Sequence, residues 1–315
     1  MADAQTLYSA QDDFPHPVLV EHRFWHETYW FWFFNGERKF GGWLYNYIRP
    51  VIGVTGGGCF VWDDTAWNHM EVPYYASYAA QPMPRVEGNT VEFPSRTVIE
   101  VKETMKRFHL SHVDRDWIDV NLDWDAVMEP WPTMHGDPPR LQHIDQVGRV
   151  TGTVTLHGET IPIDCLAIRD RTWSPRQERW KDGGGYGYTN AAADNGRLAF
   201  LHGRYLIVDG VGHELESKRT VERNREHGYL ERFIVEGRDR EGRTLEAVGE
   251  PVSRMAMPIP GVHAVVWTSL IRWTLNGVEA WGEDQEPWPL NRWAEVRRAQ
   301  RAGTWVEPVD ERRAR

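Results

Sequence analysis

The hydrophobic and polar positions of this chain alternate in short runs that are typical of β-strands, whereas helical periodicity is scarce. Residues Thr28–Phe34 form an aromatic run that is followed by Asn35-Gly36 and then by a second run, Arg38–Tyr47. Asn-Gly between two such runs predicts a β-hairpin, because both central residues of the turn need a positive φ. The same dipeptide recurs at Asn276-Gly277, between two late runs.

Similar runs bounded by Gly, Pro, Asn and Asp follow along most of the chain, and together they predict roughly fifteen strands. Two segments have a helical pattern, Leu290–Ala302 and, weakly, Asp125–Met128. Several predicted strands are too long for a flat open sheet, so closure is expected, which removes exposed edges. The further predicted strands are Gly58–Asp63, Arg96–Leu110, Asp114–Leu122, Arg149–Leu156, Thr160–Asp170, Leu198–His202, Tyr205–Val211, His213–Val221, Gly228–Gly237, Arg243–Gly249, Val262–Leu275 and Val278–Gly282.

A glycine-rich, strand-poor segment, Gln177–Asn195, separates two hairpin-rich halves. We therefore predict an all-β fold of two antiparallel β-barrels packed side by side, with a short C-terminal helix. The N-terminal barrel is expected over residues 1–185. The C-terminal barrel, with the closing helix, is expected over residues 186–315.

Composition adds three constraints to this prediction. Tryptophan accounts for 17 of 315 residues, which favours an aromatic-lined interior or cavity, since each indole brings a large apolar area. The net charge of −10 disfavours a nucleic-acid partner. The two cysteines, Cys59 and Cys165, are too few for a disulfide framework, which favours a reduced, cytoplasmic setting. No apolar run is long enough for a membrane-spanning helix, and the acidic N-terminus is unlike a secretory signal.

Several familiar cofactor and catalytic motifs are missing from the sequence. The glycine triplets at 56–58 and 183–185 lack the context of a phosphate-binding loop, and there is no G-x-S-x-G motif. His22 and His26 would share one strand face, but no third metal ligand is implied. We therefore expect no cofactor and no metal, and a chemistry that depends on the protein's own side chains.

Three polar groups stand out within the aromatic strands. Glu27 and His26 precede the aromatic run of the first hairpin, and a carboxylate is costly to bury there unless it is paired or protonated. A second group alternates acidic residues between His112 and Asp123, and is more readily explained as solvent-facing charges. The third group, at 168–176, places Asp170 between arginines and next to Trp173. For this third group a functional role is slightly favoured over ion pairs at a barrel rim.

The sequences HETYWFWFF, ERKFGGW, IRDRTWSPR and GVEAWGEDQEPW resemble segments of the carotenoid 1,2-hydratase superfamily, the AttH-like or hydroxyneurosporene-synthase-like proteins. The resemblance implies twin lipocalin-like barrels and activity on hydrophobic molecules. Hydratases of that group have a motif that resembles H-D-H-x-W-G. At the matching position this chain has Arg169-Asp170-Arg171-Thr172-Trp173-Ser174. Both histidines are replaced by arginine, which indicates a separate bacterial branch rather than carotenoid hydration itself.

Acid/base chemistry on an alkene needs a protonated acid and protection for the positive charge that develops. Burial in an aromatic pocket raises the pKa of a carboxyl group, and indole faces attract cations. The candidate catalytic residues are Asp170, Arg171, Glu27 and His202. If its neighbouring arginines keep Asp170 ionised, Glu27 or His202 is the better acid. The candidate substrate-binding residues are Trp30, Trp32, Trp173, Tyr29 and Tyr205.

Strand geometry restricts how these residues combine in a cavity near the junction of the halves. On a regular strand Glu27 lines up with Tyr29, whereas Trp30 and Trp32 face the other way. A β-bulge near Glu27 would be needed to bring all of them to one cavity. Without a bulge, Glu27 stays with Tyr29 and the two tryptophans become wall or packing residues.

Two functions are therefore carried forward from the sequence. The first is a cofactor-independent lyase or isomerase that hydrates, dehydrates, cyclises or isomerises a hydrophobic isoprenoid-, steroid- or polyketide-like molecule. The second is a non-catalytic carrier of a hydrophobic ligand, which uses the barrel only as an apolar cavity. The expected partner is in both cases a hydrophobic small molecule, with no nucleic acid and no membrane span, and the oligomeric state is left open.

Overall fold

A computed structural model describes residues 8–17, 22–135, 141–175, 187–259 and 263–312. Within these residues strands dominate and there is one α-helix, α1 (Leu290–Arg301), so the predicted fold class is confirmed. The chain forms two compact units. The first comprises Met1–Phe33, Gly42–Phe60 and Tyr74–Gln177, and the second comprises Phe34–Gly41, Val61–Pro73 and Glu178–Arg315. The predicted boundary at residue 185 lies outside the described residues and stays a prediction.

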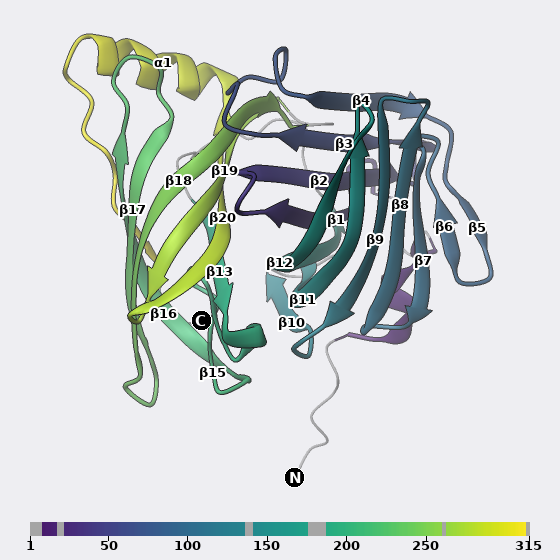
Figure 1. The fold of residues 1–315 in the computed structure, drawn as a ribbon, viewed down its shortest axis with the longest axis horizontal. Helices are drawn as coiled ribbons and strands as arrows, with labels where there is room; N and C mark the ends of the chain where they lie inside the picture. The colour runs from purple at the N-terminus through teal and green to yellow at the C-terminus, as the bar shows by residue number, and fades with distance from the viewer. Residues whose placement is uncertain (1–7, 18–21, 136–140, 176–186, 260–262, 313–315) are drawn as a thin grey trace. The chain divides into compact units, whose positions relative to one another are not determined.

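One antiparallel sheet contains all the strands up to β12, and Figure 1 shows its long strands side by side. Its strand order is β4-β3-β2-β1-β12-β11-β9-β8-β7-β6-β5, with β10 paired to β11. The strands are β1 (Trp25–Asn35), β2 (Phe40–Arg49), β3 (Val54–Trp62), β4 (Tyr74–Gln81), β5 (Arg85–Glu87), β6 (Thr90–Glu92), β7 (Thr97–Glu103), β8 (Arg107–Asp114), β9 (Ile118–Ala126), β10 (Trp131–His135), β11 (Leu141–Leu156) and β12 (Glu159–Pro175).

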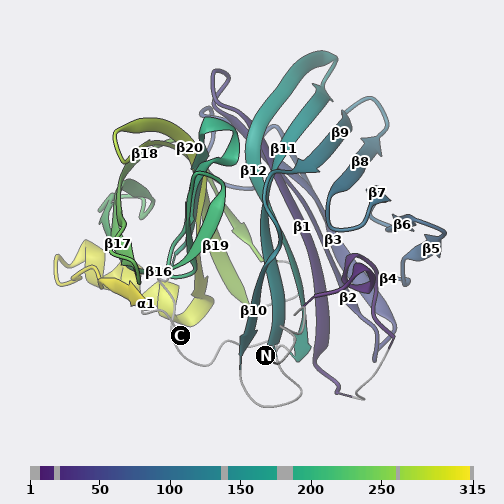
Figure 2. The same ribbon diagram turned by 90° about the horizontal axis from the view of Figure 1, so that it is seen from below.

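The second sheet closes on itself. Its order is β15-β14-β13-β20-β19-β18-β17-β16-β21, and β15 also pairs with β16, so eight strands form a ring that we call the second barrel. Figure 2 shows these strands curving together. They are β13 (Tyr188–Ala193), β14 (Leu198–Leu201), β15 (Tyr205–Val208), β16 (Val211–Arg223), β17 (Leu230–Asp239), β18 (Thr244–Pro258), β19 (Ala264–Leu275), β20 (Val278–Pro289) and the short edge strand β21 (Asp310–Arg312).

The interior of the second barrel has an apolar part and a polar part. Ile271, Trp273 and Leu275 of β19 belong to one buried apolar cluster. Ser269 and Trp267 continue the same face of β19, because alternate residues of a strand point the same way. Directly opposite them on β20 lie Asp284 and Glu286. The polar part of the interior is therefore built on the same strands as the apolar core.

Four sequence predictions of secondary structure are corrected by the structure. The segment Gln177–Asn195, expected to be strand-poor, contains β13. The first hairpin turns over residues 36–39, with a positive φ at Lys39, rather than at Asn35-Gly36. The run Arg96–Leu110 is two strands, β7 and β8, separated by a turn in which Met105 has a φ of 61°. Residues 125–128 are not helical, because β9 continues to Ala126 and pairs with β11. The predicted C-terminal helix is confirmed as α1, which packs against β19 and β20.

Candidate functional site

In the first unit, Glu27 and Arg171 form a fully buried ion pair. They meet because β1 and β12 pair in register, with Glu27 opposite Trp173 and Tyr29 opposite Arg171. Arg171 Nη2 lies 2.7 Å from Glu27 Oε2 and 2.9 Å from the Tyr29 hydroxyl. The guanidinium also lies over the Tyr29 ring, 3.7 Å from its centroid. Four predicted site residues, Glu27, Tyr29, Arg171 and Trp173, thus share one face of the sheet.

A histidine that the sequence analysis did not select completes this cluster. His16 Nδ1 lies 3.1 Å from Glu27 Oε2, and His16 Nε2 lies 2.8 Å from Asp12 Oδ1. Its ring stacks on Trp173 with a centroid distance of 4.8 Å. Asp12 belongs to a short 3₁₀ helix, Ala10–Asp13, so the N-terminal segment covers this part of the sheet.

The charges and hydrogen bonds of the cluster shift the pKa values of Glu27 and His16 in opposite directions. Burial by itself would raise the pKa of Glu27, but the hydrogen bond from His16 and the charge of Arg171 lower it to about 2. Burial by itself would lower the pKa of His16, but its hydrogen bonds to Asp12 and Glu27 raise it. Glu27 is therefore a carboxylate rather than a proton donor. His16 holds its proton more tightly than an ordinary histidine does.

The other predicted residues of the first unit lie on the opposite face. Asp170 pairs with Trp30 across the strands, and the register from Trp25 to Phe31 contains no shift. Asp170 is half-buried and accepts a hydrogen bond from Thr28 Oγ1 at 3.4 Å. Trp30 packs edge-on against Trp43 at 5.7 Å, and Trp32 is buried. Because β1 has no bulge there, Glu27 and Tyr29 lie on the same strand face. This is the arrangement predicted for a regular strand.

His202 and Tyr205, the remaining predicted residues, belong to the second unit. His202 Nδ1 lies 2.7 Å from Ser217 Oγ, and His202 Nε2 lies 3.3 Å from Asp310 Oδ2. Burial lowers the pKa of His202 to about 4, so the imidazole is neutral at neutral pH. Tyr205 is fully buried in β15. Asp310 also accepts a hydrogen bond from Arg312 Nη2 within β21, at 2.8 Å, and its contact with His202 links β21 to the second barrel.

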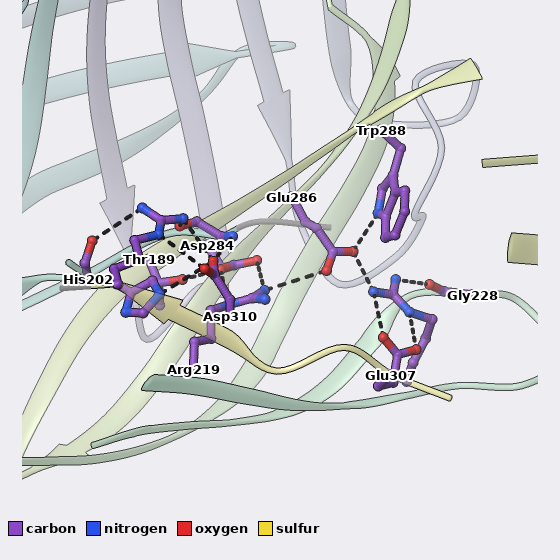
Figure 3. Close-up of polar contacts among 12 residues, drawn as sticks. Thr189, His202, Arg219, Gly228, Asp284, Glu286, Trp288, Glu307 and Asp310 are labelled. Carbon is purple, nitrogen blue, oxygen red and sulfur yellow. Dashed lines mark hydrogen bonds and ion pairs between the residues drawn. The ribbon is translucent and has the colours of Figure 1, made fainter. Parts of the chain in front are cut away.

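The second barrel holds a buried carboxylate–guanidinium pair (Figure 3). Arg219 Nε lies 3.1 Å from Asp284 Oδ1, and Arg219 Nη2 lies 2.9 Å from Asp284 Oδ2. Thr189 donates its hydroxyl to the same Oδ1 atom. All three side chains are buried, because Asp284 faces the interior of the barrel and β13 pairs with β20 at Thr189.

A second buried pair adjoins the first one. Arg223 Nη2 lies 2.6 Å from Glu286 Oε2, which also accepts a hydrogen bond from Trp288 Nε1 at 2.9 Å. Arg223 Nε donates to Glu307 Oε1 at 2.7 Å. The two pairs are linked, since Arg219 Nη2 is 3.7 Å from Glu286 Oε1 (Figure 3). This polar group therefore contains two guanidinium cations and three carboxyl groups.

The two interior carboxyl groups of β20 differ in their affinity for protons. Burial raises the pKa of Asp284 to about 6, against the opposing charge of Arg219 and with the help of the nearby Glu286 carboxylate. Burial alone would also raise the pKa of Glu286, but Arg223 and Arg219 hold it below its usual range. Two carboxyl groups with different proton affinities are a pattern found in acid/base sites. Asp284 can give or take a proton near neutral pH.

Four residues of this polar group were not predicted from the sequence: Asp284, Arg219, Glu286 and Arg223. Asp284 and Glu286 are part of the segment GVEAWGEDQEPW, and their spacing of two puts both on one strand face. Arg219 and Arg223, four residues apart in one strand, share a face in the same way. The alternation therefore indicated that each pair shares a strand face. It did not show that these faces are buried inside the barrel.

Two other kinds of feature are absent from the described part of the chain. There, no three or more His, Cys, Asp or Glu side chains are grouped so that they could hold a metal ion. Among the described residues, no helix has both the length and the apolar character needed to cross a membrane.

Comparisons with known proteins extend the picture. A family model described as a domain of unknown function (DUF7064) matches residues 9–284. No curated protein matches the chain by sequence. Among solved structures, CghA is 11% identical with a TM-score of 0.53, over 84% of this chain and 88% of CghA. Kievitone hydratase from Nectria haematococca is 9% identical with a TM-score of 0.52, over 91% and 94%.

A third solved structure, described as "a putative AttH" from Nitrosomonas europaea, is 13% identical with a TM-score of 0.43, over 84% of this chain and 91% of that chain. The matches to CghA and kievitone hydratase show that this chain has their fold. The resemblance to the AttH-like superfamily inferred from sequence is thereby confirmed at the level of the fold.

Proposed function

This chain belongs to the DUF7064 family, and we propose that it is a cofactor-independent lyase or isomerase that acts on a hydrophobic small molecule. The observation that carries the proposal is Asp284, a fully buried carboxyl group inside a closed barrel, whose pKa is raised to about 6. Such a group is partly protonated near neutral pH without metal or cofactor, and it can deliver its proton to a substrate in the buried interior. In this proposal Asp284 takes the role of the acid, for which the sequence had suggested Asp170, Glu27 or His202.

In this proposal the protonated Asp284 gives its proton to a carbon of an alkene. The new C–H bond leaves a carbocation on the substrate and a carboxylate on Asp284, which Arg219 stabilises at 2.9 Å. Water adds to the cation, or a neighbouring double bond does, or the cation loses a different proton. The proton that is released returns to Asp284 and closes the cycle. Hydration, cyclisation and isomerisation thus use the same acid.

The aromatic side chains around the interior suit this chemistry. Trp267 and Trp288 are buried at the end of the second barrel, and Trp293 of α1 packs against both of them, at 6.1 and 5.9 Å. Indole faces attract positive charge, and the attraction strengthens where water is excluded. The fold supports the proposal as well, because one of the proteins that share it is named a hydratase.

The residues predicted from sequence remain a second proposed centre. Glu27 and Arg171 are joined to each other and to His16, and Asp170 lies on the opposite face of the same strands. His202 is placed in the second unit, next to Ser217. The two centres can be distinguished by substituting each of these residues and Asp284 and comparing the variants in the isotope-labelling assay described below.

A non-catalytic carrier is the second candidate function. The observation that favours it is that Arg219 and Arg223 are already paired with carboxylates, as in a purely structural network. Buried pairs of this kind can fix a single arrangement of a core without taking part in chemistry. A carrier would return its ligand unchanged, which the following experiment detects.

The experiment uses isotopically labelled water and needs no known substrate. The purified full chain is incubated with an organic extract of its source cells in ²H₂O or in H₂¹⁸O, and the extract is analysed by mass spectrometry. We expect a hydrophobic compound to gain ²H, or ¹⁸O if water adds, with the wild type and not with Asp284→Asn. Compounds that bind to both proteins and gain no label would contradict the proposal and favour the carrier.

A further inference from the structure

The side chain of Arg254 projects into the second barrel because of a β-bulge. In the pairing of β18 with β19, the register shifts between Pro251 and Ser253, after which Arg254 lies opposite Ser269 and Ala256 opposite Trp267. Directly opposed residues project from the same face of a sheet. Arg254 therefore shares the interior face with Ser269 and Trp267, although simple alternation from the start of β18 would point it outward.

Arg254 differs from the other two arginines of this interior. Arg219 and Arg223 each have a carboxylate within 3 Å. Arg254 has no carboxylate within 4 Å among the described residues, and none of those residues accepts a hydrogen bond from its buried Nε. Its guanidinium lies over the Tyr229 ring at 4.2 Å and has one long contact, 3.5 Å, to a carbonyl of its own strand. A half-buried cation without a counterion is costly to keep.

A second donor next to Arg254 is also without a partner. Trp267 is 3% exposed, and within the described part of the chain nothing accepts a hydrogen bond from its Nε1. Its ring lies 6.3 Å from the Tyr229 ring, on which Arg254 rests. Two buried N–H donors that lie close together on one face thus lack an acceptor within the described residues, and a buried donor without an acceptor is unfavourable.

The pairing of β18 with β17 ends before it reaches these residues. β17 and β18 pair only from Phe233 to Arg238 and from Thr244 to Gly249. Beyond that point β18 pairs with the segment 67–69 instead, through Ala256 N to Trp67 O at 2.8 Å. Trp67 is 39% exposed and stacks on Trp267 at 6.0 Å. The partly exposed Trp67 therefore connects the protein surface to Trp267, on the interior face that also carries Arg254.

We propose that the second barrel binds a hydrophobic molecule with a carboxylate group, and that Arg254 and Trp267 Nε1 hold this carboxylate. The inference rests on the proposed function and names its substrate class. Arg254, Ser269 and Asp284 form one row across β18, β19 and β20. Neighbouring strands are about 4.8 Å apart, so the carboxylate site and the acid are separated by roughly 10 Å along this row. The reacting carbon of the substrate is accordingly several bonds away from its carboxylate.

A carboxylate fits these donors better than a phosphate does. One guanidinium and one indole N–H match a single negative charge with two acceptor oxygens. No lysine approaches Arg254 within the described chain, and Glu231 acts on it at longer range. A dianionic phosphate would keep an excess of negative charge in a buried interior, which is unfavourable.

Binding of simple amphiphiles tests the proposal directly. We expect calorimetric titration of the full chain to show that dodecanoate binds at least tenfold more tightly than dodecanol or methyl dodecanoate. We expect dodecyl phosphate to bind no more tightly than dodecanoate. Absence of dodecanoate binding, equal affinity for the alcohol, or clearly tighter binding of the phosphate would overturn the proposal. These comparisons need no variant and so do not depend on how a variant folds.

A matched pair of variants locates the site. Arg254→Gln should weaken dodecanoate binding at least tenfold and change dodecanol binding less than twofold, because only the carboxylate loses a charge-assisted hydrogen bond. Arg272→Gln is the control, since Arg272 lies on β19, is exposed and pairs with Glu279. Unchanged dodecanoate affinity in Arg254→Gln, or an equal loss in Arg272→Gln, would refute the assignment.

The outcome for this site can be told apart from the outcome for the proposed function. Binding of dodecanoate requires no turnover, and Asp284→Asn is expected to retain it. If Arg254→Gln binds dodecanoate normally while Asp284→Asn abolishes label incorporation, the enzyme proposal stands and the carboxylate site is wrong. If Arg254 governs binding while no compound gains label, the carboxylate site stands and the protein is a carrier.

Discussion

Arg219 places its Nε and Nη2 on the two carboxylate oxygens of Asp284, at 3.1 and 2.9 Å, inside a closed barrel. Both side chains of the pair are buried, and Asp284 nevertheless keeps a raised pKa. Burial therefore outweighs the attraction of one guanidinium here, and the nearby Glu286 carboxylate further opposes ionisation of Asp284. The pKa of Asp284 is thus close enough to neutral pH for both its protonated and its ionised form to be populated.

Asp284→Asn should lower the rate of label incorporation about 10²-fold or more, the usual contribution of a general acid. In the wild type, the rate should fall as the pH rises through about 6, because the protonated form of Asp284 is lost there. Rates measured from pH 5 to pH 8 check both expectations. Glu279→Gln is the matched control, since Glu279 is an exposed carboxylate of the same strand β20. A wild-type rate that is flat across pH 6 would contradict the role of Asp284.

Asp284 should also make the free energy of unfolding depend on pH. Its pKa is about 6 in the folded protein and 3.8 as the ordinary value, so the folded state binds the proton more tightly. This contribution is present below pH 4 and is lost as the pH rises from about 4 to about 6, by ~3 kcal/mol. Denaturant unfolding of wild type and Asp284→Asn at pH 4 and pH 7 measures it. The stability of the variant relative to wild type should increase with pH, and an unchanged difference would refute the shift.

Glu27→Gln should destabilise the first unit by about 3–5 kcal/mol, because it leaves the buried Arg171 cation without its carboxylate. The pKa of Glu27 is lowered to about 2, so its stabilising effect is present at neutral pH and is lost as the pH falls from about 4.5 to about 2. The difference in the free energy of unfolding between wild type and variant, measured by denaturant unfolding, should therefore become smaller at acidic pH. Asp164→Asn, which removes an exposed ion pair with Arg149, should cost less than about 1 kcal/mol.

Asp170→Asn separates the two proposed centres. The sequence-based assignment predicts that this variant loses turnover and keeps ligand binding and thermal stability. Asp170 is half-buried and its hydrogen bond from Thr28 is long, so a folded variant is expected. Label incorporation measured in parallel with Asp284→Asn gives the answer. Normal turnover in Asp170→Asn with loss in Asp284→Asn would refute Asp170 and assign the chemistry to the second barrel.

Local pattern was enough to predict the fold class. The Asn-Gly turn at 276–277 and the alternating strands follow from backbone preferences of a few adjacent residues. The first hairpin was predicted correctly, but its turn runs over residues 36–39 and has its positive φ at Lys39 rather than at Asn35-Gly36. The C-terminal helix followed from the composition of one segment in the same way. The run Arg96–Leu110 was assigned wrongly as one strand, because the turn at Met105 contains none of the usual turn residues.

The candidate site could be predicted only in part. Alternation correctly grouped Glu27 with Tyr29, and Arg171 with Trp173, because a regular strand has a period of two. It could not show that His16 lies on Trp173, since the N-terminal segment reaches this position through tertiary contacts. Arg254 lay beyond prediction for a different reason, since the bulge between Pro251 and Ser253 reverses the face on which it lies.

The sequence by itself determined which residues share a strand face, because that depends on the period of the backbone alone. Asp284 and Glu286 share a face in this sense through their spacing of two. Only the tertiary structure decided which face is buried and which charges meet there, since burial and ion pairing depend on strands far apart in the chain. The raised pKa of Asp284 is such a property: it arises from the closure of the barrel around it, against the attraction of Arg219, 65 residues away in sequence.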